Sequence, residues 1–286
     1  MNSLRDNRQY LLPSGLAVAI AGVLASPIVY AQEANITELD AIEVSADAAE
    51  PSGTAPSDGY TAEATVTGTK TTTNVVETPQ SISTVTADQI EDQNAANLGE
   101  VLRYTAGARG ETFGFEPRTT FLRIRGFDVA TSGLFRDNLK LANPGFAAGY
   151  SLEPYGAERI DVLKGPSSVL YGQAGPGGLV NYVSKRPTFD TRREVRVEAG
   201  TNDLVQGQFD ISGAVNDSDT LAVRLVGLVR DSETQVDFVN DDRKYLAPSL
   251  TWQPTDATRL TVLAHWQYDD TQPSQRYPLQ GTLEPN

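Results

Sequence analysis

The residues of this sequence that could do chemistry are a few serines, glycines and carboxylates. Ser167 and Ser168 follow a Gly-Pro pair, but no Gly-x-Ser-x-Gly elbow surrounds them and the single histidine, His265, is not nearby. The glycine-rich stretch 172–178 lacks the Gly-Lys-Ser/Thr ending of a phosphate-binding loop and indicates tight turns. We therefore predict that the chain is not an enzyme.

Metal and cofactor sites have equally little support in the sequence. Asp217, Asp219, Asp241 and Asp242 carry the oxygen ligands that Ca²⁺ prefers, but acidic residues in turns are usually only solvated. The chain has no cysteine, which excludes disulfides, thiolate metal sites and thiol catalysis and is typical of a periplasmic or cell-surface protein. We predict no cofactor and no directly bound metal.

The charge balance excludes another class of function. Lysine and arginine number 23 against 37 acidic residues, a net charge of -14. Because nucleic acids and anionic lipid surfaces repel such a chain, neither is expected as its main partner.

Residues 1–31 have the pattern of a secretory signal peptide. Arg5 and Arg8 give a basic start, an apolar stretch runs from Leu16 to Ala25, and small residues end at Ala31. The alternative is a membrane-anchoring helix, but the apolar core spans about ten residues where a transmembrane helix needs ~20. The pattern predicts export and cleavage after Ala31.

Residues 32–70 are predicted to form a flexible tail. The segment is rich in Ala, Ser, Thr, Gly and Pro, and it contains no basic residue before Lys70. Within it, residues 39–45 alternate apolar and polar side chains and predict a strand that can add to the edge of a partner's sheet. The alternative is chance alternation in a linker.

Residues 71–187 predict a small α+β domain. Thr86 with Gln89, and Asn97 with Glu100, have the spacing of helix capping boxes, which predicts helices over 87–94 and 98–104. Short β-rich runs punctuated by Gly-Pro and Gly-Gly lie at Ser81 to Val85, Thr120 to Arg125, Arg159 to Leu163 and Leu179 to Ser184.

From residue 188 to 286 the chain predicts antiparallel strands with one apolar and one polar face. Val205 to Ser212 and Leu260 to Asp269 alternate strictly. In a soluble sandwich the apolar face meets a second sheet, whereas in a membrane barrel it meets lipid. Strands of about ten residues suit a tilted membrane crossing. Short turns alternate with the longer loop 232–242, which favours the barrel. About five strands are expected, too few to close, so we interpret the sequence as an N-terminal fragment.

Several runs in this order resemble the plug signature of TonB-dependent siderophore receptors. The runs are Glu77 to Ser83, Arg125 to Phe127, Val162 to Gln173, Pro176 to Gly178 and Val183 to Pro187. Residues 139–141 and Pro154-Tyr155 are similar to the ferric hydroxamate, or ferrichrome-type, branch.

The resemblance implies an α+β plug domain followed by the first strands of an antiparallel transmembrane β-barrel, which has about 22 strands in the family. It implies a monomeric integral protein of the Gram-negative outer membrane, in contact with lipid and with its N-terminal tail in the periplasm. Its partners would be TonB, with the inner-membrane energising complex, and a ferric siderophore, so that iron enters only as part of the ligand.

The resemblance also implies roles for individual residues. The TonB box would be Leu39, Asp40, Ala41, Ile42, Glu43, Val44 and Ser45. Siderophore contacts would come from Phe113, Phe115, Arg118, Phe146, Tyr150 and Tyr277, whose aromatic rings suit a bulky, mostly uncharged iron chelate. Arg125 and Lys164 would lock the plug to glutamates of the barrel wall that lie beyond Asn286. Lysine replaces the branch's usual arginine at 164 and loses its bidentate fork.

Two other classes of function stay open at this point. One is a TonB-dependent receptor for another scarce solute, such as cobalamin, haem or a glycan. The other is a soluble exported β-rich binding module, in which the apolar strand faces would meet each other and the plug-like motifs would have no explanation.

Overall fold

The computed structural model describes residues 52–142, 149, 151–215 and 219–274. The chain divides into two units, Met1–Asp47 and Ala48–Asn286, and the described residues all belong to the second. Residues 52–187 are called the plug below, and residues 188–274 the wall.

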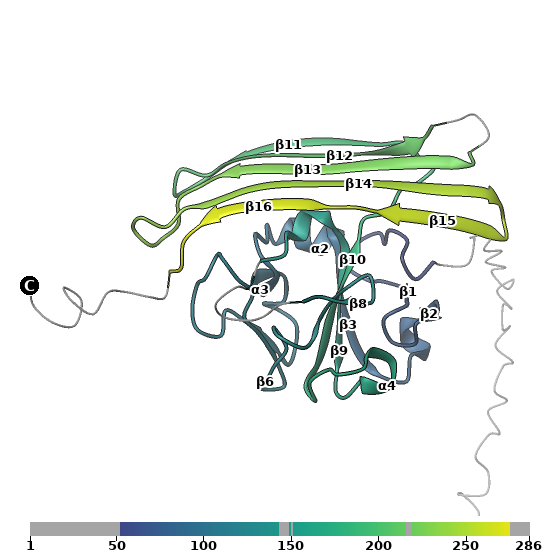
Figure 1. Ribbon diagram of the computed structural model, residues 1–286, viewed down its shortest axis with the longest axis horizontal. Coiled ribbons are helices and arrows are strands. Elements are labelled where there is room, and N and C mark those ends of the chain that lie inside the picture. The colour runs from purple at the N-terminus through teal and green to yellow at the C-terminus, as the bar shows by residue number, and fades with distance from the viewer. Residues whose placement is uncertain (1–51, 143–148, 150, 216–218, 275–286) are drawn as a thin grey trace, which may run out of the picture. The chain divides into compact units, whose positions relative to one another are not determined.

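The plug is built on a five-stranded sheet with the order β3-β9-β10-β7-β8 (Figure 1). Its strands are β3 Ser81–Thr86, β7 Leu134–Arg136, β8 Leu139–Lys140, β9 Ala157–Lys164 and β10 Gly178–Ser184. Neighbours are antiparallel except β10 and β7, which are parallel. Nearly every residue of β9 and β10 is buried because both faces of the sheet are covered.

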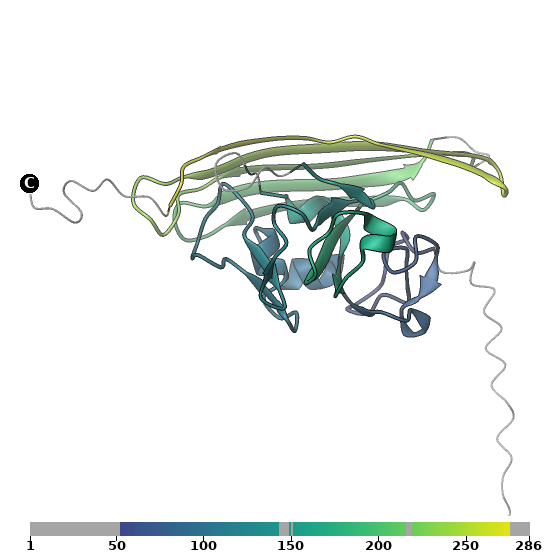
Figure 2. The same cartoon turned by 60° about the horizontal axis from the view of Figure 1, so that its bottom comes forward.

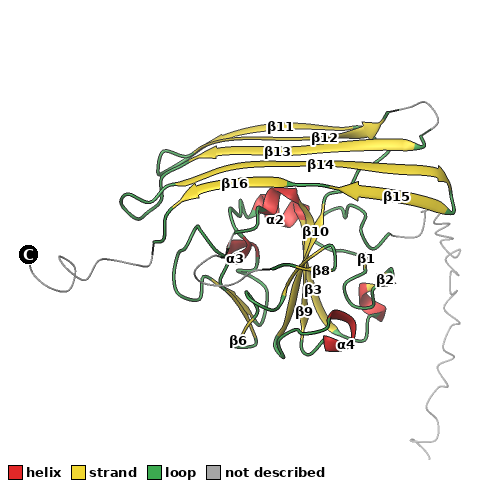
Figure 3. Cartoon of the chain, viewed as in Figure 1, coloured by secondary structure: helices red, strands yellow, loops and turns green. Residues whose placement is uncertain are grey.

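Short helices and two small sheets surround this central sheet (Figure 3). The helices are η1 Val75–Glu77, α2 Ala87–Asp92, α3 Leu98–Val101, η2 Pro154–Gly156 and α4 Ser168–Tyr171. The small sheets pair β1 Ala64–Thr65 with β2 Thr73–Asn74, and order β4 Ala108–Gly110, β5 Leu122–Ile124 and β6 Phe127–Asp128 side by side. The expected α+β plug is therefore confirmed.

Both predicted capping boxes start helices. The Thr86 hydroxyl accepts the backbone N–H of Gln89 at 3.3 Å, and the Asn97 side chain accepts that of Glu100 at 3.0 Å. Both helices end earlier than the sequence predicted, and after α3 the chain leaves through turns that reach Gly107, whose φ is 76°. Caps are local features, so they fix where a helix begins better than where it ends.

The two faces of the plug sheet are covered differently. On the first face α2, α3 and β5 contribute to a cluster of Leu, Ile and Val side chains that includes Leu102, Ile160 and Val162. On the second face α4 covers a smaller cluster that includes Phe135 and Leu163. The apolar core of the plug therefore lies mainly on the first face.

The prediction of a solvated tail up to residue 70 is wrong for its last part. Ala62 and Ala64 are buried, and Thr65 and Thr67 are completely inaccessible. The composition of this stretch is too polar for an apolar core, but its small side chains fit against polar groups of the plug sheet. The folded domain therefore begins before residue 71.

The wall is an antiparallel meander that lies across one side of the plug (Figures 1 and 2). Its strands are β11 Arg192–Ala199, β12 Val205–Ala214, β13 Leu221–Asp231, β14 Asp241–Thr255, β15 Thr258–Leu263 and β16 Trp266–Thr271. Both β15 and β16 pair with β14, so they continue one line of strand that is interrupted at Ala264 and His265. This gives the five strand lines expected from the sequence.

The alternation of the wall strands sorts side chains by face as predicted. In β12, Gln206, Gln208 and Asp210 are buried, whereas Val205 and Ile211 are exposed. The polar face is the covered one because it packs on the plug, and the apolar face points away from it. A soluble sandwich would have the opposite arrangement.

No helix in the described part of the chain is long and apolar enough to cross a membrane.

Candidate functional site

Charged side chains join the plug to the polar face of the wall. The plug supplies Glu153 and Glu158, which flank η2, and the wall supplies Arg224, Arg230 and Arg243 from β13 and β14. All five side chains are at least nine-tenths buried. Because an unpaired buried charge is strongly destabilising, their pairing determines how the plug sits on the wall.

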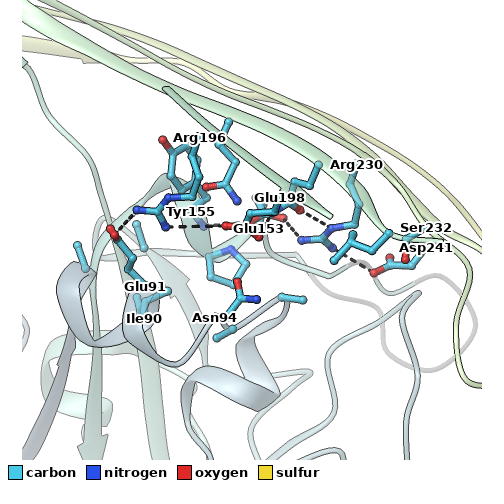
Figure 4. Close-up of a pocket in the computed structure, with 18 of the residues that line it drawn as sticks. Ile90, Glu91, Asn94, Glu153, Tyr155, Arg196, Glu198, Arg230, Ser232 and Asp241 are labelled. Carbon is cyan, nitrogen blue, oxygen red and sulfur yellow. Dashed lines mark hydrogen bonds and ion pairs between the residues drawn. The ribbon is translucent and has the colours of Figure 1, made fainter. Parts of the chain in front are cut away.

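Glu153 is the centre of this network, and Figure 4 shows it together with Arg230 and Tyr155. Its Oε2 atom lies 2.9 Å from Nη1 of Arg243 and 3.6 Å from Nη2 of Arg230. Its Oε1 atom accepts the backbone N–H of Tyr155 at 3.0 Å and so caps η2. Its backbone carbonyl accepts the Tyr182 hydroxyl at 2.9 Å. One residue therefore joins two wall strands to the central strand β10 of the plug.

Arg224 forms the second junction. Its guanidinium binds Asp210 through two hydrogen bonds of 2.8 and 2.7 Å, and its Nη1 atom lies 3.2 Å from Glu158. Lys185, at the end of the plug, places its ammonium 3.1 Å from the same aspartate. Burial lowers the pKa of Lys185, and the Asp210 charge opposes this effect. Arg192 of β11 also lies 3.4 Å from Asp210, so this buried aspartate is surrounded by three cations.

A cavity of about 230 Å³ lies beside Glu153, between α2 and the wall (Figure 4). Glu91, Arg196 and Arg230 are among its lining residues, and Arg196 forms an ion pair with Glu91 across it. The cavity is smaller than the pockets of about 300–1,000 Å³ that hold drug-sized ligands. Its charged lining suits a few water molecules and does not suit an iron chelate.

Three of the six residues predicted to contact a siderophore lie in the described residues, on one loop of the plug. The Phe113 ring is exposed and packs edge-to-face on Phe121 at 5.2 Å. Phe115 is half-buried, and its carbonyl accepts a hydrogen bond from Ser274 of the wall. Arg118 lies 3.6 Å from Glu116. Of these three residues, Phe115 lies beside the wall, where it lines one hollow together with the loop residue Thr234.

The other predicted contacts lie outside the described residues. They are the siderophore residues Phe146, Tyr150 and Tyr277, and the TonB box from Leu39 to Ser45. The signal peptide over residues 1–31 also falls there.

The structure brings the two predicted lock residues together. Arg125 has a φ of 51° in the turn between β5 and β6, and its guanidinium lies beside Gly165. Lys164 donates to the Ser83 hydroxyl at 2.8 Å. Burial lowers the pKa of Lys164, and the charge of Arg125 lowers it further. In the described ranges neither cation has an ion pair with a carboxylate, so a pair of like charges is left to be neutralised.

The sequence reasoning missed the network around Glu153 and Arg224. A signal was present, because Arg224, Arg230 and Arg243 all fall on the polar face of the predicted strands. Those of their acidic partners that lie in the plug are 66 to 90 residues away in the sequence. Alternation predicts which face a side chain takes but not which distant residue it meets.

Comparison with known proteins agrees with this architecture. Residues 74–179 match the TonB-dependent receptor plug domain. The chain is 38% identical over 279 residues to the ferrichrome outer-membrane transporter and phage receptor of Escherichia coli, and 38% identical over 258 residues to the ferrioxamine receptor of Yersinia enterocolitica. These matches cover 94% and 90% of the chain but 36% of each relative, so the chain spans about a third of the relatives' length.

Solved structures share the fold of plug and wall. The ferripyoverdine receptor of Pseudomonas aeruginosa, bound to ferripyoverdine, superposes with a TM-score of 0.71 at 27% identity and covers 80% of this chain and 31% of its own. The alcaligin receptor of Bordetella pertussis superposes with a TM-score of 0.64 at 25% identity and covers 75% and 37%.

A plug packed on the polar face of an antiparallel wall defines the class of outer-membrane TonB-dependent receptors. The chain belongs to this family, in its siderophore-receptor branch, and is more similar to the ferrichrome and ferrioxamine receptors than to the ferripyoverdine receptor of P. aeruginosa, at 28% identity. The matched family is one of transport receptors, which agrees with the prediction that the chain is not an enzyme.

Proposed function

We propose that the protein is a receptor and TonB-energised transporter for ferric siderophores of the hydroxamate type. The observation that carries this proposal is the 38% identity to a ferrichrome and to a ferrioxamine receptor, over 94% and 90% of the chain. Both relatives take their names from hydroxamate iron chelates. Iron enters as part of the ligand, and the protein itself needs no cofactor.

The proposed ligand site is formed by the loop that carries Phe113, Phe115 and Arg118, together with Phe146, Tyr150 and Tyr277. The exposed Phe113 ring supports this assignment because an aromatic face can pack on the apolar arms of a chelate. The Arg123 guanidinium lies 5.6 Å from the Phe113 ring, which adds a donor for chelate oxygens.

The proposed source of energy is TonB, which would pair with residues 39–45 by adding them to a sheet edge. A scarce nutrient must bind tightly, and a nanomolar dissociation constant corresponds to about -12 kcal/mol. Such a ligand does not leave toward the periplasm without work. The outer membrane has no ATP, so the work must arrive through the tail.

The proposed lock consists of Arg125 and Lys164, which would pair with glutamates of the barrel. The closeness of these two cations supports the proposal, because their mutual repulsion is relieved by carboxylates placed between them. We further propose that the receptor acts as a monomer in contact with outer-membrane lipid.

One specific relative favours a second candidate ligand. The chain is 33% identical over 243 residues to the metal-pseudopaline receptor of P. aeruginosa, which suggests a different class of metal chelate.

A growth assay separates these ligands. The full-length receptor is expressed in an iron-starved strain that lacks its own siderophore receptors and siderophores. Ferrichrome, ferrioxamine B, a ferric catecholate and a metal-pseudopaline complex are supplied singly, with cobalamin, haem and a glycan as non-siderophore solutes in strains that depend on each of them. Growth on a hydroxamate chelate supports the proposal. Growth only with a different solute would refute it.

A further inference from the structure

Residues 52–78, called the N-terminal segment here, are held on the second face of the plug sheet by polar contacts. Its buried side chains are small, and they include Ala62, Ala64, Thr65 and Thr67. In the described residues the segment forms no hydrogen bond or ion pair with the wall. The N-terminal segment is therefore attached to the plug alone.

Gly59 and Tyr60 of the segment bond to Asp88 and Asp92 of α2 at the surface, whereas its buried contacts form one directed chain of hydrogen bonds. The hydroxyls of Thr65 and Thr67 both donate to Oδ2 of Asp161, at 2.7 and 2.5 Å. The Asn181 amide donates to the Thr67 oxygen at 2.9 Å, and the Asn138 backbone N–H donates to Oδ1 of Asn181 at 2.9 Å. A carboxylate can only accept, so both threonines must donate to it, and this fixes the direction of every bond.

Asp161 is a strong acceptor because of where it lies. It is fully buried in β9, and its other oxygen, Oδ1, lies 3.4 Å from Nε of the equally buried Arg159. The arginine keeps a positive charge beside the carboxylate. Hydrogen bonds to a charged acceptor are roughly twice as strong as neutral ones, so the two threonine hydroxyls make the strong buried contacts of the segment.

Tyr171 adds a second contact to the same place. Its hydroxyl lies 2.8 Å from the Thr67 carbonyl and 2.6 Å from Oδ1 of Asn138, two acceptors that share its one proton. The Lys70 ammonium lies 3.3 Å from the centre of its ring. Burial raises the pKa of the Tyr171 phenol, and the Asp161 charge raises it further, so the hydroxyl stays a donor. Both contacts are polar, and water can replace them when the segment leaves.

We propose that Asp161 is the positioning residue that holds the N-terminal segment on the plug, and that breaking its two threonine hydrogen bonds is the step that frees the segment. The physical reason is the difference between the two faces of the sheet. Separating the covering elements from the apolar first face exposes Leu, Ile and Val side chains to water. Separating the N-terminal segment from the second face exposes hydroxyls and a carboxylate, which water solvates. The proposed function enters only as the source of the pull on the tail.

The attachment of the N-terminal segment to the plug can be measured without a transport assay. The 286 residues contain no cysteine, so Ala62→Cys, introduced into a full-length receptor in which any cysteine elsewhere has been replaced by serine, gives a single thiol signal. The rate of its modification by a maleimide reports how often the segment opens. Thr65→Val with Thr67→Val removes both donors and keeps the side-chain shape. We expect modification at least ~10-fold faster, and a similar rise for Asp161→Asn.

Two controls decide between release of the segment and general unfolding. Asp128→Asn removes an exposed carboxylate that accepts from the Thr131 hydroxyl at 2.9 Å and should leave the rate unchanged. Ala95→Cys, which packs against the first-face cluster, reports opening of the rest of the plug. A faster reaction at Ala62→Cys alone supports the proposal. An unchanged rate in the threonine and aspartate variants, or an equal rise at both cysteines, would overturn it.

The two proposals can fail separately. A receptor whose segment opens as expected, but which supports no uptake of any siderophore, would contradict the proposed function and leave the role of Asp161 in place.

Discussion

Glu153 of the plug and Arg243 of the wall form an ion pair of 2.9 Å, with both side chains at most 2% exposed. Burying two charges costs several kcal/mol for each, and the cost is recovered only where the geometry and the additional hydrogen bonds are good. Glu153 meets this condition through its bonds to Tyr155 and its approach to Arg230. The pair therefore fixes the position of the plug on the wall more than it adds to stability.

Glu153→Gln should weaken the attachment of the plug to the wall. The amide leaves two arginines without their shared charge, and breaking a buried pair costs about 3–5 kcal/mol. The free energy of plug unfolding in the purified receptor, followed by protease cleavage against denaturant concentration, should fall by this amount. The matched control is Glu77→Gln, an exposed carboxylate that contacts Asn74, and it should change little. Equal stabilities of the two variants would contradict the assignment.

Arg224→Lys should also destabilise the receptor, although the charge is kept. Lysine cannot form the two parallel hydrogen bonds to Asp210 and also reach Glu158, because it lacks the planar fork. We expect a loss of about 1–3 kcal/mol in the free energy of unfolding. Arg193→Lys, on the exposed face of the neighbouring strand β11, serves as the control and should be neutral within the error of the measurement.

The hold of the N-terminal segment should weaken at high pH. Burial and the charge of Asp161 raise the pKa of Tyr171 in the folded state above the ordinary phenol value of about 10. The contribution of Tyr171 to the free energy of unfolding is complete below about pH 10. It is lost as the pH rises above that value, because the phenol ionises first in the unfolded state. The difference in unfolding free energy between the parent and Tyr171→Phe should shrink by up to ~1.4 kcal/mol per pH unit. A constant difference between about pH 8 and 11 would contradict this.

Arg125→Ala tests the proposed lock. Removing one of two adjacent cations relieves the repulsion on Lys164 but also removes a partner for the proposed wall glutamates. If the lock exists, the plug of the full-length receptor should be displaced more easily and be cleaved faster by protease. Lys164→Arg should have the opposite effect, because it restores the bidentate fork. Unchanged cleavage in both variants would remove the lock from the account.

Local features of the fold were predictable from the sequence. Thr86 and Asn97 cap helices through contacts within three residues, and the alternation in β12 decides which face each residue takes. These features depend on neighbours in the chain, so a single sequence contains all the information needed for them.

Contacts between distant residues were not predictable in the same way. Thr65 and Thr67 look like parts of a polar tail until Asp161, 96 and 94 positions away, is known to face them. Glu153 meets Arg243 across 90 positions. Each pairing depends on the tertiary arrangement, and the residue types alone allow many other partners.

Energy supplied through the tail is proposed to drive uptake of an iron chelate. Ile42→Pro tests it most directly, since proline removes a backbone donor and cannot join a TonB sheet as an added strand. Cells that express the full-length receptor are given ferrichrome or ferrioxamine B with radioactive iron, and surface binding and internal iron are measured separately. We expect the unchanged receptor to bind the chelate and accumulate iron, whereas Ile42→Pro should bind the chelate equally well but accumulate no iron. Accumulation by Ile42→Pro at the parental rate would contradict it.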